Sequence, residues 1–319
     1  IDDLRSELEV FSPDATLLHS LAGHFDLAII GREDAIIPAV NQWRAWQGVP
    51  TVFIEGPHLL DFQRIIDHYI LDKQRVGERF ASGLKSYDNE AGVQASVVRH
   101  IDSMMQAHDI CSRMAMHGCR VLEVGSGTGS LSMILDNAIT DGYLEMWDLA
   151  GEPCIEGPQR AFRRVDAEVA IAAVPSKSFD VIATASTVQW FNSPARFLRQ
   201  CSRVLATDGY LVLSSFVSGN LAQISAVTGR GLPLMTLEQW RLAVPDGLEI
   251  VDIMQRDYDL DFASAIDVFR HLKATGVNAL GRNSHGESTL HDILGRYQPD
   301  LDCRYHITYR PFIMILQKR

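Results

Sequence analysis

The chain has 319 residues, 46% of them hydrophobic and 22% charged, and a formal net charge of -11 at pH 7. This composition is that of an ordinary globular protein with room for about two domains. The acidic balance argues against nucleic acid as the main partner, because phosphate binding needs a dense basic face. Five scattered cysteines form no C-x-x-C pair and no His/Cys cluster, so neither a metal site nor a disulfide framework is predicted. No apolar run reaches the ~18 residues of a membrane span and no signal peptide is visible, so we expect a cytoplasmic protein without membrane contact.

Residues 1–71 are predicted to form a segment of their own. A strand over 25–30 leads past Asp34 into an apolar run, and a second strand over 50–55 ends just before His58. This order of strand, acid, strand and histidine resembles the C-terminal end of an α/β-hydrolase, whose triad follows the order Ser, Asp, His. The resemblance implies that His58 is the general base and that Asp34 orients it.

A nucleophile for this esterase-like pair is missing from the sequence. No G-x-S-x-G precedes Asp34, and a general base without a nucleophile cannot carry out acyl chemistry. We therefore expect residues 1–71 to be inactive alone. Because the chain begins at Ile1 rather than at a methionine, we also expect a longer precursor.

From residue 72 onward a charged stretch precedes a predicted amphipathic helix. Its apolar face repeats at four-residue spacing and should be core; it consists of Val93, Val97, Ile101 and Met105. Tyr87 and Gln94, before and at the start of this helix, are candidates to cover a ligand. A surface tyrosine and a solvated amide are equally good interpretations of the spacing.

The stretch VLEVGSGTGS, residues 121–130, predicts a buried strand that turns sharply into a helix. Glycines let the backbone turn tightly and approach a ligand closely. A dinucleotide fingerprint would need its third glycine at Ser130. The pattern E-x-G-x-G-x-G instead resembles the first motif of class I S-adenosylmethionine methyltransferases, whose acid helps to hold the cationic methionine part of the cofactor; the alternative is a plain glycine-rich loop. The resemblance implies a cofactor site at Glu123, Gly125, Ser126, Gly127 and Gly129.

A second acid follows at the spacing that a nucleotide site requires. The strand over 143–147 ends at Asp148, and we assign the adjacent Leu149 to the same site. Asp148 lies roughly twenty residues beyond Gly125, where the next strand of a nucleotide-binding unit presents a carboxylate to the ribose hydroxyls. Asp166 and Ala167 resemble the methyltransferase segment whose Asp accepts from the adenine amino group, although an ordinary charged turn is the alternative.

Strands and helices then alternate, which predicts a doubly wound α/β sheet. Ligands of such sheets bind outside the carboxyl ends of the strands. Ala185 ends the strand over 181–185 and Gln189 and Trp190 follow it, so all three should face the site, unless Trp190 is a core aromatic. Residues 217–306 hold helical stretches before a last strand over 311–317, and we expect an inserted helical cap that sets substrate specificity.

Four further stretches make the resemblance narrower: FASGLKSYDNEAGVQ (80–94), STVQWF (186–191), FRHLKATGVNALG (269–281) and RYHITYRPFIMIL (304–316). With the cofactor motifs, they make residues 72–319 similar to the malonyl-[acyl-carrier protein] O-methyltransferases of biotin synthesis. The implied fold is a class I methyltransferase, Rossmann-like doubly wound sheet with an inserted helical cap, after a partial α/β-hydrolase segment over 1–71. That segment would resemble an esterase that removes the methyl group from pimeloyl-carrier esters.

The resemblance implies an enzyme that moves a methyl group from S-adenosylmethionine to the free carboxylate of malonyl-acyl carrier protein, or of malonyl-CoA. Methylation of another small carboxylic acid, or a bifunctional protein with a carboxylesterase half, is the alternative. An ionised carboxylate needs no base, but a cation or several donors must offset its burial. The candidates are Lys273, Tyr87, Gln189, Trp190, Tyr305 and Tyr309. Lys273 could equally be a solvated helix lysine, and Tyr87 a surface residue. Arg196, Arg199 and Arg203 share a helix face that could meet an acidic carrier.

Overall fold

The computed structural model describes residues 29–30, 52–53, 71, 73–74, 76–81, 92–228, 231–232, 234–275 and 290–319. In the N-terminal part it places two short strands, β1 (Ile29–Ile30) and β2 (Val52–Phe53), which pair in parallel. Both fall within the strands predicted there. Asp34 and His58 lie outside the described residues, so the hydrolase-like interpretation of residues 1–71 stays a prediction.

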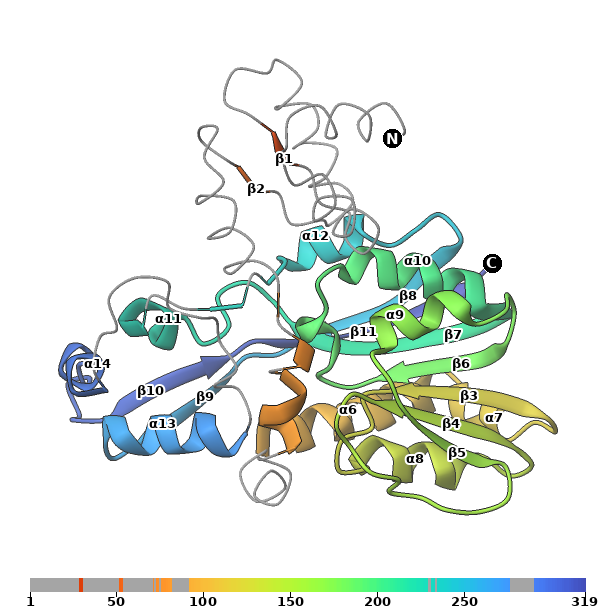
Figure 1. Ribbon diagram of the computed structural model, residues 1–319, viewed down its shortest axis with the longest axis horizontal. Helices are drawn as coiled ribbons and strands as arrows, with labels where there is room; N and C mark the ends of the chain where they lie inside the picture. Colours follow the sequence, from red (N-terminus) through yellow and green to blue (C-terminus); the bar gives the residue numbers. More distant parts are fainter. Residues whose placement is uncertain are drawn as a thin grey trace.

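A seven-stranded sheet forms the centre of the molecule (Figure 1). Its strands are β3 (Cys119–Val124), β4 (Gly142–Asp148), β5 (Arg160–Arg164), β6 (Phe179–Thr184), β7 (Leu205–Phe216), β8 (Leu248–Gln255) and β11 (Pro311–Lys318). They lie in the order β5-β4-β3-β6-β7-β11-β8. The first five run parallel, whereas β11 is antiparallel to both of its neighbours. This is the doubly wound α/β sheet that the alternation of strands and helices predicted, with a reversed strand inserted near one edge.

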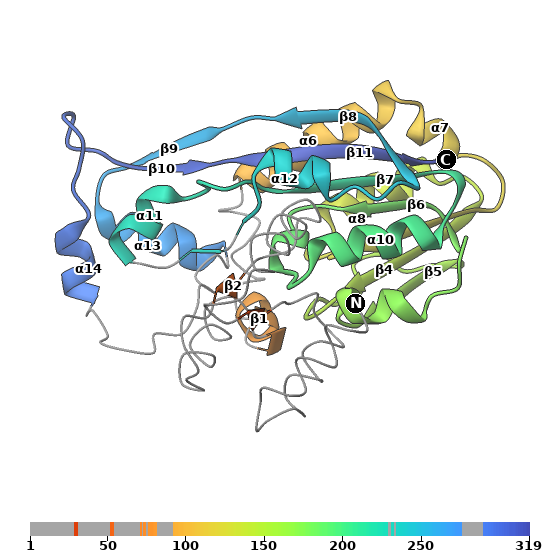
Figure 2. The same cartoon turned by 90° about the horizontal axis from the view of Figure 1, so that it is seen from above.

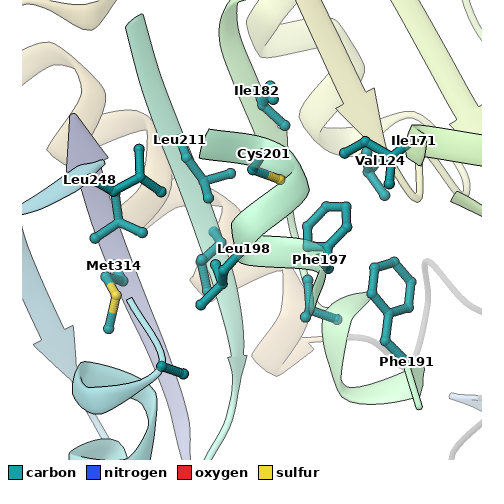
Figure 3. Close-up of a cluster of buried hydrophobic side chains, with 14 of the residues drawn as sticks. Val124, Ile171, Ile182, Phe191, Phe197, Leu198, Cys201, Leu211, Leu248 and Met314 are labelled. Atoms are coloured by element: carbon teal, nitrogen blue, oxygen red, sulfur yellow. The ribbon is translucent and has the colours of Figure 1, made fainter. Parts of the chain in front are cut away.

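Helices cover both faces of the sheet because successive strand residues point to opposite sides. Val121 packs in one core layer and Leu122, the next residue, in the other. The Val121 layer holds α6 (Gly92–Ala107), α7 (Ile110–Met114) and α8 (Ser130–Ala138). On the opposite face are α9 (Ala167–Ala170), η1 (Ile171–Ala173), α10 (Pro194–Val204) and α12 (Leu237–Leu242). Figure 3 shows this second layer, with Phe197, Leu198 and Cys201 of α10 packed over the sheet.

The predicted apolar face of α6 is confirmed. All four of its predicted core positions are buried, with Ile101 and Met105 fully enclosed. Burying each such side chain contributes about 1.5–3 kcal/mol. Because α6 is fixed in this way, the start of the helix, where Gln94 lies, is held beside the carboxyl ends of the strands.

The expected helical cap is partly wrong. Residues 248–255 form the edge strand β8 of the main sheet, and β9 (Tyr258–Phe262) and β10 (Tyr305–Tyr309) form an antiparallel pair beyond it. Figure 2 shows β9 and β10 continuing away from β8 and β11. Three helices pack beside them, α11 (Ala222–Thr228), α13 (Ala265–Ala274) and α14 (Leu290–Arg296). The expected helical stretches are thus present, but half-buried β-branched residues such as Ile250 and Ile253 favour strand at the sheet edge.

Candidate functional site

A cavity of about 260 Å³ opens at the carboxyl ends of β3, β4 and β6. It is enclosed by the turns that follow these strands, by the start of α6, and by a helical covering segment, residues 73–74 and 76–81. The predicted residues that line it are Gln94, Glu123, Gly125, Ser126, Gly127, Asp148, Leu149, Asp166, Ala167, Ala185 and Trp190. The structure therefore brings together side chains that lie on several different elements. Gly129 stands behind the cavity rather than in its wall.

The turn between β3 and α8 can be built only with glycine at two positions. Gly125 has φ +79, and a Cβ there would lie 2.0 Å from the Oγ1 atom of Thr187. Gly129 has φ +91 and would place a Cβ 2.7 Å from the Cβ atom of Cys154. Left-handed backbone costs other residues about 1–2 kcal/mol even without a clash. By contrast, a Cβ on Gly127 would meet nothing within 4 Å, so this residue leaves open space in the cavity wall.

Asp148 ties the glycine turn to the loop after β4. Its Oδ2 atom accepts from the Gly127 N–H at 2.9 Å, and its Oδ1 atom accepts from Ala150 and Gly151 at 2.8 and 2.7 Å. Three backbone donors hold the carboxylate in one orientation. A carboxylate has about four acceptor sites, so Asp148 can still accept from a ligand hydroxyl in the cavity.

Glu123 is the buried acid of the site. Its side chain lines the cavity, and the residue is only 1% exposed. The Oε2 atom accepts from the Ser132 hydroxyl at 2.5 Å, while Oε1 has no hydrogen-bond partner among the described residues. Burial raises the pKa of Glu123 to about 8, the Ser132 hydrogen bond lowers it, and the charge of Asp148 adds to the increase. A buried acid with a free oxygen fits a cationic ligand group.

Asp166 lines the cavity at the start of α9. Its Oδ1 atom accepts from the Glu168 N–H at 3.0 Å and so caps α9. Ala167, the next residue, also faces the cavity. This places an acceptor and the start of a helix where the adenine-contacting segment was expected.

Lys73 and Glu168 were missed by the sequence reasoning. The Lys73 ammonium lies 2.8 Å from Oε2 of Glu168 and 4.6 Å from the ring centre of Phe191. The Glu168 carboxylate also accepts from the backbone N–H groups of Asn192 and Ser193, at 2.9 and 2.5 Å. This ion pair therefore links the covering segment to the turn before α10. The charged run after residue 71 was visible in the sequence, but nothing in it indicated a partner about a hundred residues away.

Aromatic contacts hold the other end of the covering segment. The ring of Phe80 meets that of Trp190 edge to face, with centroids 5.3 Å apart, and Val76 packs in the same cluster. Trp190 both lines the cavity and is buried, so its two sequence interpretations are compatible. Just before the segment, the Asn192 side chain bonds both backbone groups of Leu71. The segment thus forms an apolar wall over the cavity.

The predicted substrate residues are not gathered in the same way. Gln189 donates to the Ser186 carbonyl at 2.5 Å and accepts from Ser215 at 3.4 Å, and it does not line the cavity. Tyr309 is 1% exposed, and its hydroxyl bonds Nε2 of His271 at 3.1 Å within a separate apolar cluster. Tyr305 packs edge to face on Tyr297 at the rim of that cluster.

For two more of the substrate candidates, the structure shows no contact with the cavity. Lys273 is exposed on α13, and Tyr87 lies outside the described residues. Of the predicted carrier-binding arginines, Arg203 bonds the carbonyls of Ile171 and Val174. Its guanidinium therefore holds η1 against α10. This structural contact was not expected when Arg203 was assigned to carrier docking.

Neither a metal centre nor a membrane span is found in the described part of the chain. Its His, Cys, Asp and Glu side chains form no group of three or more that could hold an ion. None of the described helices has the length and apolar character needed to cross a bilayer.

Several known proteins are similar to this chain. A family model described as a methyltransferase domain matches residues 122–213, which span β3 to β7. The malonyl-[acyl-carrier protein] O-methyltransferase of Haemophilus influenzae is 31% identical over 252 residues, covering 77% of this chain and 94% of that protein. The protein of the same name from Bacteroides fragilis is 28% identical over 334 residues; all of this chain is covered, but it spans only 66% of that relative's length. Among solved structures, the YcgJ protein of Bacillus subtilis superposes with a TM-score of 0.48 at 16% identity, covering 69% of this chain and 99% of that one.

Proposed function

Because this chain belongs to the malonyl-[acyl-carrier protein] O-methyltransferase family, we propose that it methylates the free carboxylate of malonyl-[acyl-carrier protein], with S-adenosylmethionine as the methyl donor. The observation that carries the proposal is the cavity formed by Glu123, the glycine turn and Asp148. Glu123, Asp148 and the open glycine wall suit a ligand with a cationic end and a sugar. A methyltransferase domain that matches these same strands supports this cofactor.

The residues of the cavity divide among the parts of the cofactor. Glu123 would hold the methionine end, Asp148 the ribose hydroxyls, and Asp166 with Ala167 the adenine edge. Gln94 and Leu149 would cover the ligand from α6 and from the loop after β4. When bound, the cofactor supplies an activated methyl group on a positively charged sulfur.

The acceptor needs positioning more than proton transfer. A carboxylic acid with a pKa of about 4 is already ionised at neutral pH, so no general base is required. The chain must instead exclude water and hold the carboxylate against the methyl group. Val76, Phe80 and Trp190 form an apolar wall that excludes water.

A group that offsets the buried charge of the acceptor is also needed. Gln189 is the described candidate next to the cavity, because it adjoins Trp190 in η2 (Val188–Trp190). Lys273, Tyr305 and Tyr309 belong to the elements beyond the main sheet and would contribute only if the cap moves toward the cavity. Tyr87 completes the proposed set.

We further propose that residues 1–71 end a hydrolase-like domain. Alignment of the whole chain with a longer relative supports a multidomain protein, and Asp34 with His58 supports an esterase half. Without a serine nucleophile, this chain alone should not hydrolyse a short methyl ester. Ester hydrolysis above the rate of a His58→Ala variant would contradict this expectation.

Intact-mass spectrometry of malonyl-[acyl-carrier protein] tests the main proposal. Incubation with S-adenosylmethionine should add one methyl group to the carrier-bound acyl chain, and alkaline hydrolysis should remove it as expected for an ester. Free malonate and malonyl-CoA serve as competing acceptors at equal concentration. An Asp148→Ala variant should lose the increment. Methylation of free malonate at the rate of the carrier form, or no methylation of any of the three, would contradict the proposed substrate.

A further inference from the structure

We propose that Glu123 carries a proton in the free protein and loses it when the α-ammonium group of the cofactor binds, so that binding releases one proton to solvent. The inference rests on the proposed function only in taking S-adenosylmethionine as the cofactor. It adds a charge switch to a residue that otherwise would be a fixed anion. Cofactor affinity should then depend on pH through this one side chain.

The position of Glu123 makes a fixed negative charge costly. It lies near the end of β3 between Leu122 and Val124, both fully buried. One carboxyl oxygen has a hydroxyl partner, Ser132, and the other, Oε1, has none in the described part of the chain. An isolated buried carboxylate without a cation usually takes up a proton instead.

Among the described residues, the charged and titratable groups near Glu123 do not offset that charge. Asp148 on β4 is a second anion and makes ionisation of Glu123 harder. Cys154, in the loop after β4, bonds Ser132 at 3.3 Å, and burial raises the pKa of its thiol, so it is neutral at pH 7. α6 presents the uncharged Gln94.

Besides Glu123 and Asp148, the charged side chains among the described lining residues are Lys73 and Asp166, and Lys73 is the one cation of that set. The ammonium of Lys73, on the covering segment, is 2.8 Å from Glu168 and 3.9 Å from Asp166. Its charge is therefore matched by acids other than Glu123. This arrangement agrees with the elevated pKa of Glu123, about 8, for which burial is the main cause.

The unpartnered oxygen selects the kind of cation. A ligand ammonium has three N–H donors and can give Oε1 its hydrogen bond together with a positive charge. A sulfonium has no N–H group and cannot do so. The balanced step is loss of the carboxyl proton to water, with formation of a carboxylate–ammonium pair; no bond in the cofactor changes.

Calorimetry with two stable cofactor fragments tests the proposal. S-adenosylhomocysteine keeps the α-ammonium group but has an uncharged sulfur, whereas 5′-methylthioadenosine lacks the amino acid entirely. Titration at pH 7 in buffers of different ionisation enthalpy gives the number of protons released. We expect about 0.9 proton with S-adenosylhomocysteine, because a group with a pKa near 8 is mostly protonated at pH 7, and about zero with 5′-methylthioadenosine.

Two variants make the test specific to Glu123. Glu123→Gln should bind S-adenosylhomocysteine more weakly and release no proton. Ser132→Ala keeps the acid and should still release about one proton. Between pH 6 and 7 the affinity of the unmodified protein for S-adenosylhomocysteine should rise close to tenfold, while that for 5′-methylthioadenosine stays level.

Equal proton release with both fragments, or release that persists in Glu123→Gln, would overturn the inference. Its failure is separable from failure of the proposed function. Methylation of malonyl-[acyl-carrier protein] without proton release on S-adenosylhomocysteine binding would contradict only the proposed protonation change of Glu123. Proton release without methylation of the carrier would contradict only the proposed substrate.

Discussion

The Oγ1 atom of Thr187 lies 2.0 Å from the point where a Cβ on Gly125 would stand. Thr187 is held there because its hydroxyl donates to the Ala185 carbonyl at 3.0 Å. The preceding residue, Ser186, has φ +52, and its N–H donates to the Ser214 hydroxyl at 3.0 Å. The turn after β6 therefore interlocks with the glycine turn after β3, and each limits the shape of the other.

Gly125→Ala should disrupt both turns. We expect the free energy of unfolding to fall by more than about 2 kcal/mol, because the left-handed φ alone costs about 1–2 kcal/mol and the clash adds to it. Binding of S-adenosylhomocysteine should be lost. Chemical denaturation and calorimetry would measure the two effects.

Gly118→Ala is the matched control for this change. Gly118 has φ +73, but a Cβ there would meet nothing within 4 Å, and it does not line the cavity. The control should lose about 1–2 kcal/mol of stability and keep its affinity. Normal ligand binding by Gly125→Ala would show that the two turns are not interlocked in solution.

The pair formed by Lys73 and Glu168 should stabilise the covering segment. Their side chains are 19% and 6% exposed, so the pair is largely shielded from solvent. Breaking a buried pair costs about 3–5 kcal/mol, and we expect about 2 kcal/mol for Lys73→Met because lysine is partly hydrated. A double-mutant cycle with Glu168→Gln should give a coupling energy of about 1–3 kcal/mol.

Hydrogen exchange provides the local readout for this ion pair. In Lys73→Met the amides of residues 76–81 should exchange faster, while those of β3 should not change. Lys73→Arg keeps the positive charge and should behave more like the unmodified chain. Independent, additive effects of the two substitutions would argue that the pair does not hold the segment.

The gathering of the proposed cofactor residues around one cavity could be predicted from sequence because its signals are local. Glycine spacing and an acid at the end of each strand depend only on how a strand turns into a helix, and Glu123, Asp148 and Asp166 all line one cavity. The contacts of Thr187 and Lys73 depend on tertiary packing between distant segments. The periodicity of a single sequence does not indicate which distant residues will contact each other.

The positions of the proposed substrate residues were less predictable for a related reason. A tyrosine or lysine in a narrow family motif can serve packing as well as binding, and the spacing is the same in both cases. Tyr309 is buried against His271, whereas Lys273 is exposed on the neighbouring helix. The edge strand β8 was missed because its residues alternate only partly between buried and exposed.

Arg203 should contribute to stability rather than to carrier docking. Its guanidinium donates to the carbonyl oxygens of Ile171, Ala172 and Val174. Arg203→Ala would leave these acceptors without their donor, and we expect a loss of about 1–3 kcal/mol in the free energy of unfolding. Arg196 and Arg199 should therefore be tested for carrier binding in a variant that keeps Arg203. Unchanged stability of Arg203→Ala would instead favour a surface role.

His306 should make the β9–β10 pair sensitive to pH. Its ring lies between two acids, with Nδ1 bonded to Asp261 and Nε2 2.5 Å from Asp300. The hydrogen bond with Asp300 is the main cause that raises the pKa of His306, and the same bond lowers the pKa of Asp300.

The raised pKa of His306 and the lowered pKa of Asp300 define the pH range in which their contact is most stabilising. A raised histidine pKa gives stability that is complete below the unfolded value of about 6.5 and is lost as pH rises through the folded value. A lowered aspartate pKa gives stability that is present above about 4 and is lost as pH falls through the folded value. We therefore expect the backbone amides of the loop around Asp300 to be best protected from exchange between about pH 4 and 6.5 and less protected at pH 8.

Amide exchange in β10 should be measured at each pH for the unmodified protein and for His306→Asn. The difference between the two proteins does not contain the intrinsic pH dependence of exchange. If the difference between the two proteins is the same at pH 5.5 and pH 8, protonation of His306 does not stabilise this part of the fold.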